Sequence, residues 1–310
     1  MKERRERVSN ASAPRVIVVA KRSAWSRWVE EELDPRVRLL LRRRDPSVVS
    51  WAASHRSHIR TLEAVQRTLE KLGARVHLIH RPHAQFDTSD AALVVSVGGD
   101  GTLLAASHNV GSTPILGVNS APDHSVGFFC AASRAGLTTT LEAALEGRLR
   151  SVALSRMSVE VNGRIRARRV LNEALFSHPS PAATSRYIVF FGRRKEEQRS
   201  SGFWIGPAAG STAAQRSSGG RVLPLASKSL QLIVREAYRA WGKPPYRLLR
   251  LLITERQELI VKSKMSEASV FLDGPYEVVR VKLGDELRFR VSDEPLTVLG
   301  LGARRERVRA

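Results

Sequence analysis

A single acidic residue, Asp100, stands among three glycines in the stretch GGDGT, residues 98–102. The apolar run ALVVSV precedes it and TLLAASHNV follows, so a buried strand should end and a helix begin here. Glycines at such a junction can take positive φ and let the backbone approach a ligand, and backbone N–H groups there can bind phosphate. Asp100 could bind a sugar hydroxyl or Mg²⁺, or take a proton from a hydroxyl that attacks a phosphoryl group. The alternative is a tight turn in which Asp100 caps the following helix.

Two later segments carry groups that could hold a nucleotide. Asn172 and Glu173 directly follow the strand-like ARRVL, and their amide and carboxylate could grip a ribose diol or an adenine edge. Residues 206–220, GPAAGSTAAQRSSGG, are small and polar and have little value for a core. A close-fitting nucleotide loop explains this composition, and so does a solvated linker. Asn172 and Glu173 could likewise form only a strand-end turn.

Composition narrows the class of protein. The chain has 310 residues, of which 42% are hydrophobic, enough for one large domain or two ordinary ones. No apolar run approaches the roughly 18–20 residues of a membrane span, and the N-terminus lacks the apolar region of a signal peptide. The single cysteine, Cys130, cannot form an internal disulfide, so we expect a cytoplasmic protein that is not attached to a membrane.

The net charge of +21 points to an anionic partner or to a generally basic surface. The basic residues are mostly arginines scattered along the chain, and neither zinc-ligand spacing nor aromatic enrichment accompanies them. We therefore expect a basic surface and no specific nucleic-acid partner.

The first half alternates strand and helix patterns. Apolar residues recur every three or four positions in residues 54–73, which predicts a helix ended by Gly73. Other helices are expected within 102–110 and 137–147. The expected strands are 15–20, 75–80, 92–97 and 114–120, and residues 21–54 should form loop with short helical pieces. This order predicts an α/β fold: a Rossmann-like parallel-sheet domain over residues 1–150, covered on both faces.

The second half changes to alternating patterns with turn dipeptides. Asn162-Gly163 predicts a hairpin, and Asp273-Gly274 and Gly284-Asp285 stand at further turn positions. A helix is expected over residues 229–241, SLQLIVREAYRAW, with one apolar face. We expect an antiparallel β-rich, β-sandwich-like domain over residues 151–295. A tail, residues 296–310, could pack back on the first domain or fray.

Taken together and in order, these segments resemble the NAD kinase family. The resemblance rests on Gly98-Gly99-Asp100-Gly101-Thr102, Asn172-Glu173, GSTA at 210–213 and SGG at 218–220. GVNS at 117–120, GFF at 127–129 and FLDGPY near 271 also match, so the resemblance covers most of residues 90–295. GGDGT alone is shared with lipid kinases, whereas the ordered set is far more specific.

The resemblance implies transfer of the ATP γ-phosphoryl group to the 2′-hydroxyl of the adenosine ribose of NAD⁺ or NADH, with a divalent metal, Mg²⁺. Asp100 would position and deprotonate that hydroxyl, and the GGDGT backbone would position phosphates. Asn172 and Glu173 would bind the dinucleotide. The remaining residues implied to bind nucleotide are Gly98, Gly99, Gly101, Thr102, Asn119, Phe128, Gly210, Ser211, Thr212, Ala213 and Ala214, of which Thr212, Ala213 and Ala214 would line the adenine pocket near Phe128.

The loop at 207–214, PAAGSTAA, departs from the family's common Thr-Pro-Thr-Gly-Ser-Thr-Ala-Tyr, because the last aromatic residue is missing. With this departure the loop is most similar to that of the plant NADH kinase branch, so the choice between NAD⁺ and NADH as the acceptor stays open. The family resemblance also implies a homodimer or homotetramer. Two alternatives remain: a lipid kinase of the diacylglycerol or sphingosine type, which shares GGDGT, and a catalytically inactive nucleotide-binding protein.

Overall fold

The computed structural model describes residues 13–239, 241–242 and 244–301. The chain divides into two compact units. The first comprises Met1–Thr102 with Leu116–Leu149, and the second comprises Leu103–Ile115 with Arg150–Ala310. Residues 103–115 thus group with the second half of the chain, whereas the sequence analysis placed everything up to residue 150 in one domain.

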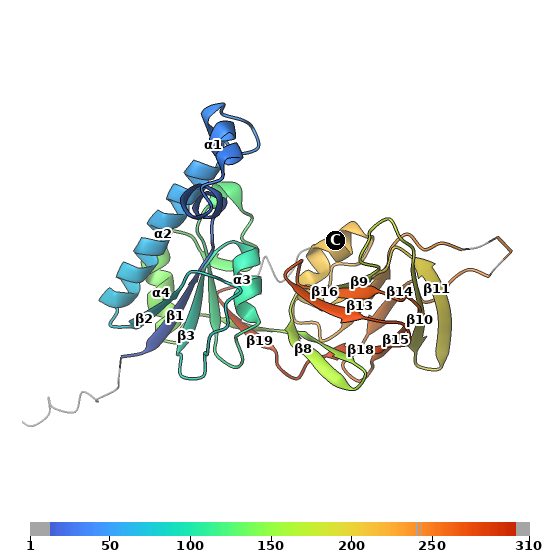
Figure 1. Ribbon diagram of the computed structural model, residues 1–310. Helices are drawn as coiled ribbons and strands as arrows, with labels where there is room; N and C mark the ends of the chain where they lie inside the picture. The colour runs from blue at the N-terminus through green and yellow to red at the C-terminus, as the bar shows by residue number, and fades with distance from the viewer. Residues whose placement is uncertain (1–12, 240, 243, 302–310) are drawn as a thin grey trace, which may run out of the picture. The chain divides into compact units, whose positions relative to one another are not determined.

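The first unit is built on a parallel sheet in the order β2-β1-β3-β4, with β5 beside β4 (Figure 1). The strands are β1 (Arg15–Ala20), β2 (Arg75–Ile79), β3 (Leu93–Gly98), β4 (Ile115–Asn119) and β5 (Cys130–Ala132). Every residue of β3 is buried, as its unbroken apolar sequence predicts. The predicted parallel α/β architecture of this half is confirmed.

Helix α2 (Trp51–Lys71) packs beside this sheet and contacts α4 (Leu137–Leu145). It buries Leu62, Val65 and Leu69, which lie on the apolar face predicted from their spacing. Gly73 follows the helix with φ of +79°, the left-handed conformation that a glycine after a helix end supplies. Between β1 and α2 the chain forms only a π-helical turn, η1 (Ser26–Glu31), and the short helix α1 (Pro35–Arg42), in line with the expected short helical pieces.

The second unit contains two six-stranded antiparallel sheets, in the orders β11-β10-β15-β18-β7-β8 and β14-β13-β12-β9-β16-β17. The first is formed by β7 (Met157–Val161), β8 (Arg164–Val170), β10 (Ser185–Phe191), β11 (Arg194–Ser200), β15 (Leu259–Ser263) and β18 (Glu286–Val291). The second is formed by β9 (Ala174–Ser177), β12 (Phe203–Gly206), β13 (Leu230–Val234), β14 (Arg250–Ile253), β16 (Ala268–Leu272) and β17 (Glu277–Val281).

An aromatic cluster joins the two sheets into a sandwich. Phe176 and Phe203 come from the second sheet, Tyr187 and Phe289 from the first, and ring centroids lie 5.1–5.9 Å apart. All four side chains are fully buried, so they form the centre of one hydrophobic core. The predicted antiparallel, sandwich-like second half is confirmed.

The turn dipeptides lie where the sequence places them. Asn162 and Gly163 both have positive φ, 50° and 75°, and connect β7 to β8 in a hairpin. Asp273 and Gly274 also have positive φ and lie between β16 and β17. The remaining strands, β6 (Ser151–Leu154) and β19 (Leu296–Leu299), pair antiparallel with each other. The last residues of the expected tail, 302–310, lie outside the described residues.

The predicted helix over residues 229–241 is wrong. Residues 230–234 form β13, hydrogen-bonded to β12 on one side and β14 on the other, and Trp241 is fully exposed. The apolar positions match a helix face by coincidence, because Leu230–Ile233 are buried without alternation. A strand with pairing partners on both edges overrides that periodicity.

Candidate functional site

Asp100 is the first residue of α3 (Asp100–Ser107), directly after β3 and Gly99. Its carboxylate accepts hydrogen bonds from the backbone N–H groups of Phe128 (2.9 Å) and Phe129 (2.8 Å). The alternative that Asp100 caps its own helix is therefore not what the structure shows. Each carboxylate oxygen keeps a further lone pair, so this half-buried group can still accept a hydroxyl proton.

The glycines of GGDGT serve close packing and not left-handed backbone, because Gly98, Gly99 and Gly101 are not among the residues with positive φ. A Cβ on Gly98 would come within 2.0 Å of Thr102 Oγ1, and one on Gly99 within 2.3 Å of Ser125 Oγ. A Cβ on Gly101 would meet nothing within 4 Å. The turn is thus tightly packed at Gly98 and Gly99 and open at Gly101, which is the only exposed one of these three glycines.

The loop that follows β4 closes against this turn within the first unit. Ser120 N donates to Gly98 O at 2.9 Å, and Asn119 Nδ2 donates to Ser125 O at 2.9 Å. Asn119 Oδ1 accepts from Ala121 N, so both ends of this buried amide hold the loop in place. Phe128 is half-buried and packs edge-on against Phe129, with centroids 5.0 Å apart. Asn119, Phe128 and GGDGT are therefore brought together.

In the second unit, Asn172 and Glu173 are held by a residue that the sequence analysis treated only as a turn. Asp273 is 3% exposed, and its carboxylate accepts from the backbone N–H of Leu171 (2.8 Å), Asn172 (2.7 Å) and Glu173 (3.1 Å). Asp273 N in turn donates to Glu173 O at 2.9 Å. The backbone of the Asn-Glu pair is thereby fixed, which leaves its side chains free for other partners.

Two side-chain oxygens of this pair are buried without a hydrogen-bond partner in the described structure, Asn172 Oδ1 and Glu173 Oε2. Burial raises the pKa of Glu173 to about 7, and the nearby negative charge of Asp273 adds to the rise. Buried polar atoms without partners are costly, so they mark where a ligand with hydroxyl or amine donors would be stabilised.

His108 completes the anchor of this pair. Its Nε2 lies 2.8 Å from Asp273 Oδ2 and its Nδ1 lies 3.1 Å from Glu277 Oε2. Burial opposes protonation, but the hydrogen bonds that the imidazolium donates to Asp273 and Glu277 outweigh it and raise the pKa of His108 to about 9. The imidazolium therefore compensates two acidic groups around neutral pH. His108 was not predicted as a site residue, because nothing near it in the chain indicates its partners.

A fully buried arginine, Arg156, fixes the segment that carries His108. Its guanidinium donates to the carbonyl oxygens of Ser107 (3.0 Å), Val110 (2.9 Å) and Pro295 (3.1 Å). Burial, followed by the positive charge of Arg169, lowers the pKa of Arg156 to about 10, so it stays charged near neutral pH.

The glycine loop packs directly on the Asn-Glu pair. This loop, residues 206–220, begins at the last residue of β12 and contains the 3-10 turn η3 (Ala208–Thr212) and the short α5 (Ala214–Ser217). A Cβ on Gly210 would lie 1.8 Å from Asn172 O, and one on Gly206 would lie 2.2 Å from the same oxygen. Gln215 Nε2 donates to Asn172 O at 3.2 Å. The solvated-linker alternative for this loop is therefore wrong, since residues 208–211 are buried.

Within this loop, Ser211 and the three residues after it differ in what they offer. Ser211 is fully buried, donates to Ala208 O and accepts from Leu223 N, so its hydroxyl is used internally. Thr212, Ala213 and Ala214 are half-exposed and present a small, mainly apolar surface. Unlike Ser211, these three residues are not fully enclosed by the rest of the unit.

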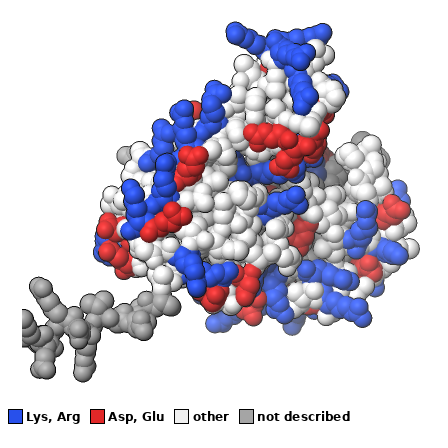
Figure 2. Space-filling model, turned by 60° about the vertical axis from the view of Figure 1, so that its left-hand side comes forward, with Lys and Arg blue, Asp and Glu red and all other residues white. Residues whose placement is uncertain are grey.

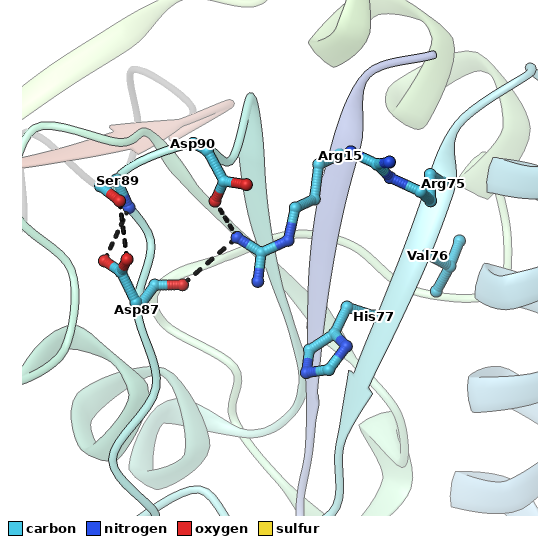
Figure 3. A pocket seen from close by; sticks show the side chains of 7 residues that line it. All are labelled: Arg15, Arg75, Val76, His77, Asp87, Ser89 and Asp90. Atoms are coloured by element: carbon cyan, nitrogen blue, oxygen red, sulfur yellow. Dashed lines mark hydrogen bonds and ion pairs between the residues drawn. The ribbon is translucent and has the colours of Figure 1, made fainter. Parts of the chain in front are cut away.

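A separate pocket lies at the opposite, amino end of the parallel strands (Figure 3). Its lining residues are Arg15, Arg75, Val76, His77, Asp87, Ser89 and Asp90. Arg15 points to the 87–90 loop, where it is paired with Asp90, and Ser89 Oγ donates to Asp87 at 2.7 Å. Because ligands of open parallel sheets bind at the carboxyl ends of the strands, we do not assign function to this pocket.

Charge is unevenly distributed over the first unit. Figure 2 shows Lys and Arg side chains gathered around α1, the uppermost helix in Figure 1. The exposed arginines of α1 and the turn after it are Arg36, Arg38, Arg42, Arg43 and Arg44. They contribute to the net charge but lie on an element separate from the GGDGT turn.

The parallel sheet that ends in GGDGT, followed by a β-sandwich with an Asn-Glu pair under a glycine loop, defines a two-domain kinase of the GGDGT class. Residues 16–149 match the family model described as the ATP-NAD kinase N-terminal domain. A probable NADH kinase of Oryza sativa subsp. japonica is 35% identical over 281 residues, 83% of this chain and 85% of the relative. The NADH kinase of Arabidopsis thaliana is 31% identical over 286 residues, 82% of this chain and 86% of the relative.

Solved structures agree in fold. An NAD kinase from Archaeoglobus fulgidus in complex with ATP has a TM-score of 0.67 at 20% identity, covering 94% of this chain and 96% of that one. Yeast NADH kinase complexed with NADH has a TM-score of 0.65 at 15% identity, covering 96% and 86%. The chain belongs to the NAD kinase family. The lipid-kinase alternative is therefore not favoured.

Proposed function

We propose that this protein is an NAD(H) kinase, which transfers the γ-phosphoryl group of ATP to the 2′-hydroxyl of the adenosine ribose of NAD⁺ or NADH to make NADP(H). The observation that carries the proposal is the pair of buried, unpartnered oxygens on Asn172 and Glu173 beneath a glycine loop. Relatives named NADH kinase and NAD kinase, and structural neighbours solved with ATP and with NADH, support it.

In the proposed reaction the 2′-hydroxyl oxygen attacks the γ-phosphorus. A new O–P bond forms, the bond to the β-phosphate bridging oxygen breaks, and ADP leaves with that electron pair. Asp100 accepts the hydroxyl proton through a lone pair that its two backbone N–H partners do not use. Because those partners fix the carboxylate, its main contribution is to position the hydroxyl.

We further propose Mg²⁺ as the metal that accompanies ATP. No cluster of three or more His, Cys, Asp or Glu residues that could hold a metal is found among residues 13–301 as described. Mg²⁺ in such sites is usually held by one or two carboxylates and mainly by the phosphates of its substrate. Such an ion, when bound, neutralises negative charge on the phosphates.

The binding roles of the remaining site residues follow their positions. We propose that Gly98, Gly99, Gly101 and Thr102 position phosphates, and that Asn119 and Phe128 shape that site from the loop after β4. Asn172 and Glu173 would accept hydrogen bonds from the ribose or adenine. Gly210 and Ser211 would hold the loop in shape, and Thr212, Ala213 and Ala214 would line the adenine pocket, whose small side chains leave no aromatic stacking surface.

For the protein's setting we propose the domain boundaries 1–150, 151–295 and 296–310, a cytoplasmic location and a homodimer or homotetramer. Among the residues that the structure describes, no helix is both long enough and apolar enough to span a membrane. No specific nucleic-acid partner is proposed.

The test is a coupled assay with purified protein, ATP and Mg²⁺, in which NAD⁺ and NADH are supplied separately and NADP(H) is measured. Product from either would support the proposal, and the ratio of kcat/KM values would give the preferred acceptor. A folded protein that forms no product from either would leave the inactive nucleotide-binding protein as the function to pursue. Binding of NADH and ATP by calorimetry would then test that alternative.

A further inference from the structure

Lys21 lies at the carboxyl end of the parallel sheet, beside the GGDGT turn. It directly follows β1, and its backbone N–H donates to Val97 O at 3.0 Å. Val97 immediately precedes Gly98, and Ala20 is paired in register with Val97. β1 and β3 are neighbouring parallel strands (Figure 1). Lys21 and Gly98–Asp100 directly follow their last residues or end them, so both lie at the carboxyl end of the sheet.

The ammonium group of Lys21 has no acidic partner. Lys21 is half-buried, and burial lowers its pKa, yet no carboxylate of the described residues forms a hydrogen bond or ion pair with it. The acidic residues of the neighbouring turn η1, and Glu32 directly after it, have other partners. Glu31 pairs with Arg22, Glu32 with Arg22 and Arg27, and Glu30 with His55 at 3.4 Å. A half-buried cation without a counter-ion is unfavourable unless a ligand supplies the negative charge.

A second observation at the same place is His58, on the buried face of α2. It is 2% exposed, hydrogen-bonds the backbone of Lys21, and leaves Nδ1 without a partner. Burial, then the positive charges of Lys21, His55 and His80, lower the pKa of His58 to about 3. After burial, the charge of Lys21 has the largest effect on this pKa, which places the Lys21 ammonium group near the buried imidazole.

Resting on the proposed kinase function, we propose that Lys21 is a ligand of the phosphate chain of the phosphoryl donor, where its ammonium group binds a phosphate oxygen beside the GGDGT turn. A lysine ammonium is a compact point charge suited to a phosphate group. The backbone N–H groups at the start of α3, directly after the neighbouring strand β3, provide further hydrogen-bond donors. His58 orients the backbone of Lys21 and does not contact the ligand.

The kinetic test compares the wild type with K21M, K21R and a matched control, K71M. Lys71 is exposed at the end of α2 and far in sequence from β1. We expect K21M to raise the KM for ATP by roughly 10- to 100-fold, the loss expected for a charged hydrogen bond. The KM for NAD⁺ or NADH should change less than about twofold, K21R should recover part of the loss, and K71M should behave as the wild type.

A binding test separates this proposal from the kinase function. Inorganic tripolyphosphate should raise the unfolding temperature of the wild type and of K71M, because it binds only the folded protein, but should not raise that of K21M. If tripolyphosphate stabilises the wild type and not K21M, but the wild type forms no NADP(H), the anion site is supported and the kinase function is overturned. An active wild type whose K21M variant keeps the KM for ATP and the response to tripolyphosphate would overturn the anion site. A raised KM for NADH alone would assign Lys21 to the acceptor and overturn the donor site. If K21M does not fold, K21Q, which keeps the polar length of the side chain, takes its place in both tests.

Discussion

Substituting Glu173 by Gln should make the protein more stable near pH 8 while it weakens dinucleotide binding. The pKa of Glu173 rises from 4.5 to about 7 in the folded state, chiefly through burial. A group whose folded pKa is raised contributes stability below its unfolded pKa and loses it as pH rises through the folded value. Ionised Glu173 therefore costs roughly 3 kcal/mol above pH 7. Gln keeps the shape without the charge.

The assay is urea unfolding of the wild type, E173Q and the control E267Q at about pH 4.5 and pH 8. Glu267 is exposed, so its substitution should change the free energy of unfolding by less than about 0.5 kcal/mol at either pH. E173Q should match the wild type near pH 4.5 and exceed it by roughly 2–3 kcal/mol near pH 8. Its KM for NAD⁺ or NADH should rise by roughly 10-fold or more, as a charged hydrogen bond is lost. Equal stability at both pH values would refute the buried, ionised state derived for Glu173.

Four other perturbations follow from the same contacts. D100N should lower kcat by roughly 100-fold or more in the coupled assay while the circular dichroism spectrum stays unchanged; near-normal turnover would remove Asp100 from the proposed mechanism. D273N should lower the free energy of unfolding by roughly 3–5 kcal/mol in urea, because an amide cannot accept all the N–H groups that the carboxylate does; a loss below 1 kcal/mol would contradict this. The raised pKa of His108, about 9, contributes stability that is complete below pH 6.5 and is lost as pH rises through 9, so H108Q should flatten the pH dependence of unfolding between those values; an unchanged slope would count against the anchor. G210A should lose roughly 2–3 kcal/mol or fail to fold, since its Cβ meets a backbone carbonyl, whereas G101A, in open helical space, should be neutral or gain up to about 1 kcal/mol; similar losses in both would contradict the packing argument.

The sequence predicted the architecture wherever local pattern and tertiary environment agree. Unbroken apolar strands such as β3 indicated a sheet covered on both faces, and Asn162-Gly163 indicated a hairpin that the positive φ values of both residues explain. The helix predicted over 229–241 failed because the spacing of a few apolar residues cannot show that strands pair on both edges.

The same limit applies to the site. The proposed ligand-binding residues of GGDGT, Asn172-Glu173 and the glycine loop stand in short motifs, so sequence could point to them. Asp273 and His108 act through contacts that span about 100 and 165 positions, as the separations of their hydrogen bonds show. Asp273 looked only like a turn residue, and His108 only like a helix end. The motif FLDGPY could suggest Asp273 as a site residue, but nothing near it in the sequence identifies the N–H groups that donate to its carboxylate.

The fit of the glycine loop on Asn172 has a consequence for how this protein could change its substrate. Gly206 and Gly210 touch a backbone oxygen, which no substitution at position 172 can remove, so neither glycine can acquire a side chain without moving a strand end. The loop is therefore fixed at Gly206 and Gly210, whereas the segment from Thr212 to Ala214, the first residue of α5, can vary. Under the proposed function, substitutions that alter nucleotide binding can be accommodated at Thr212, Ala213 and Ala214 but not at Gly206 or Gly210. A library confined to those three positions should yield folded variants with altered nucleotide affinity, while one that includes the glycines should consist mostly of variants that do not fold.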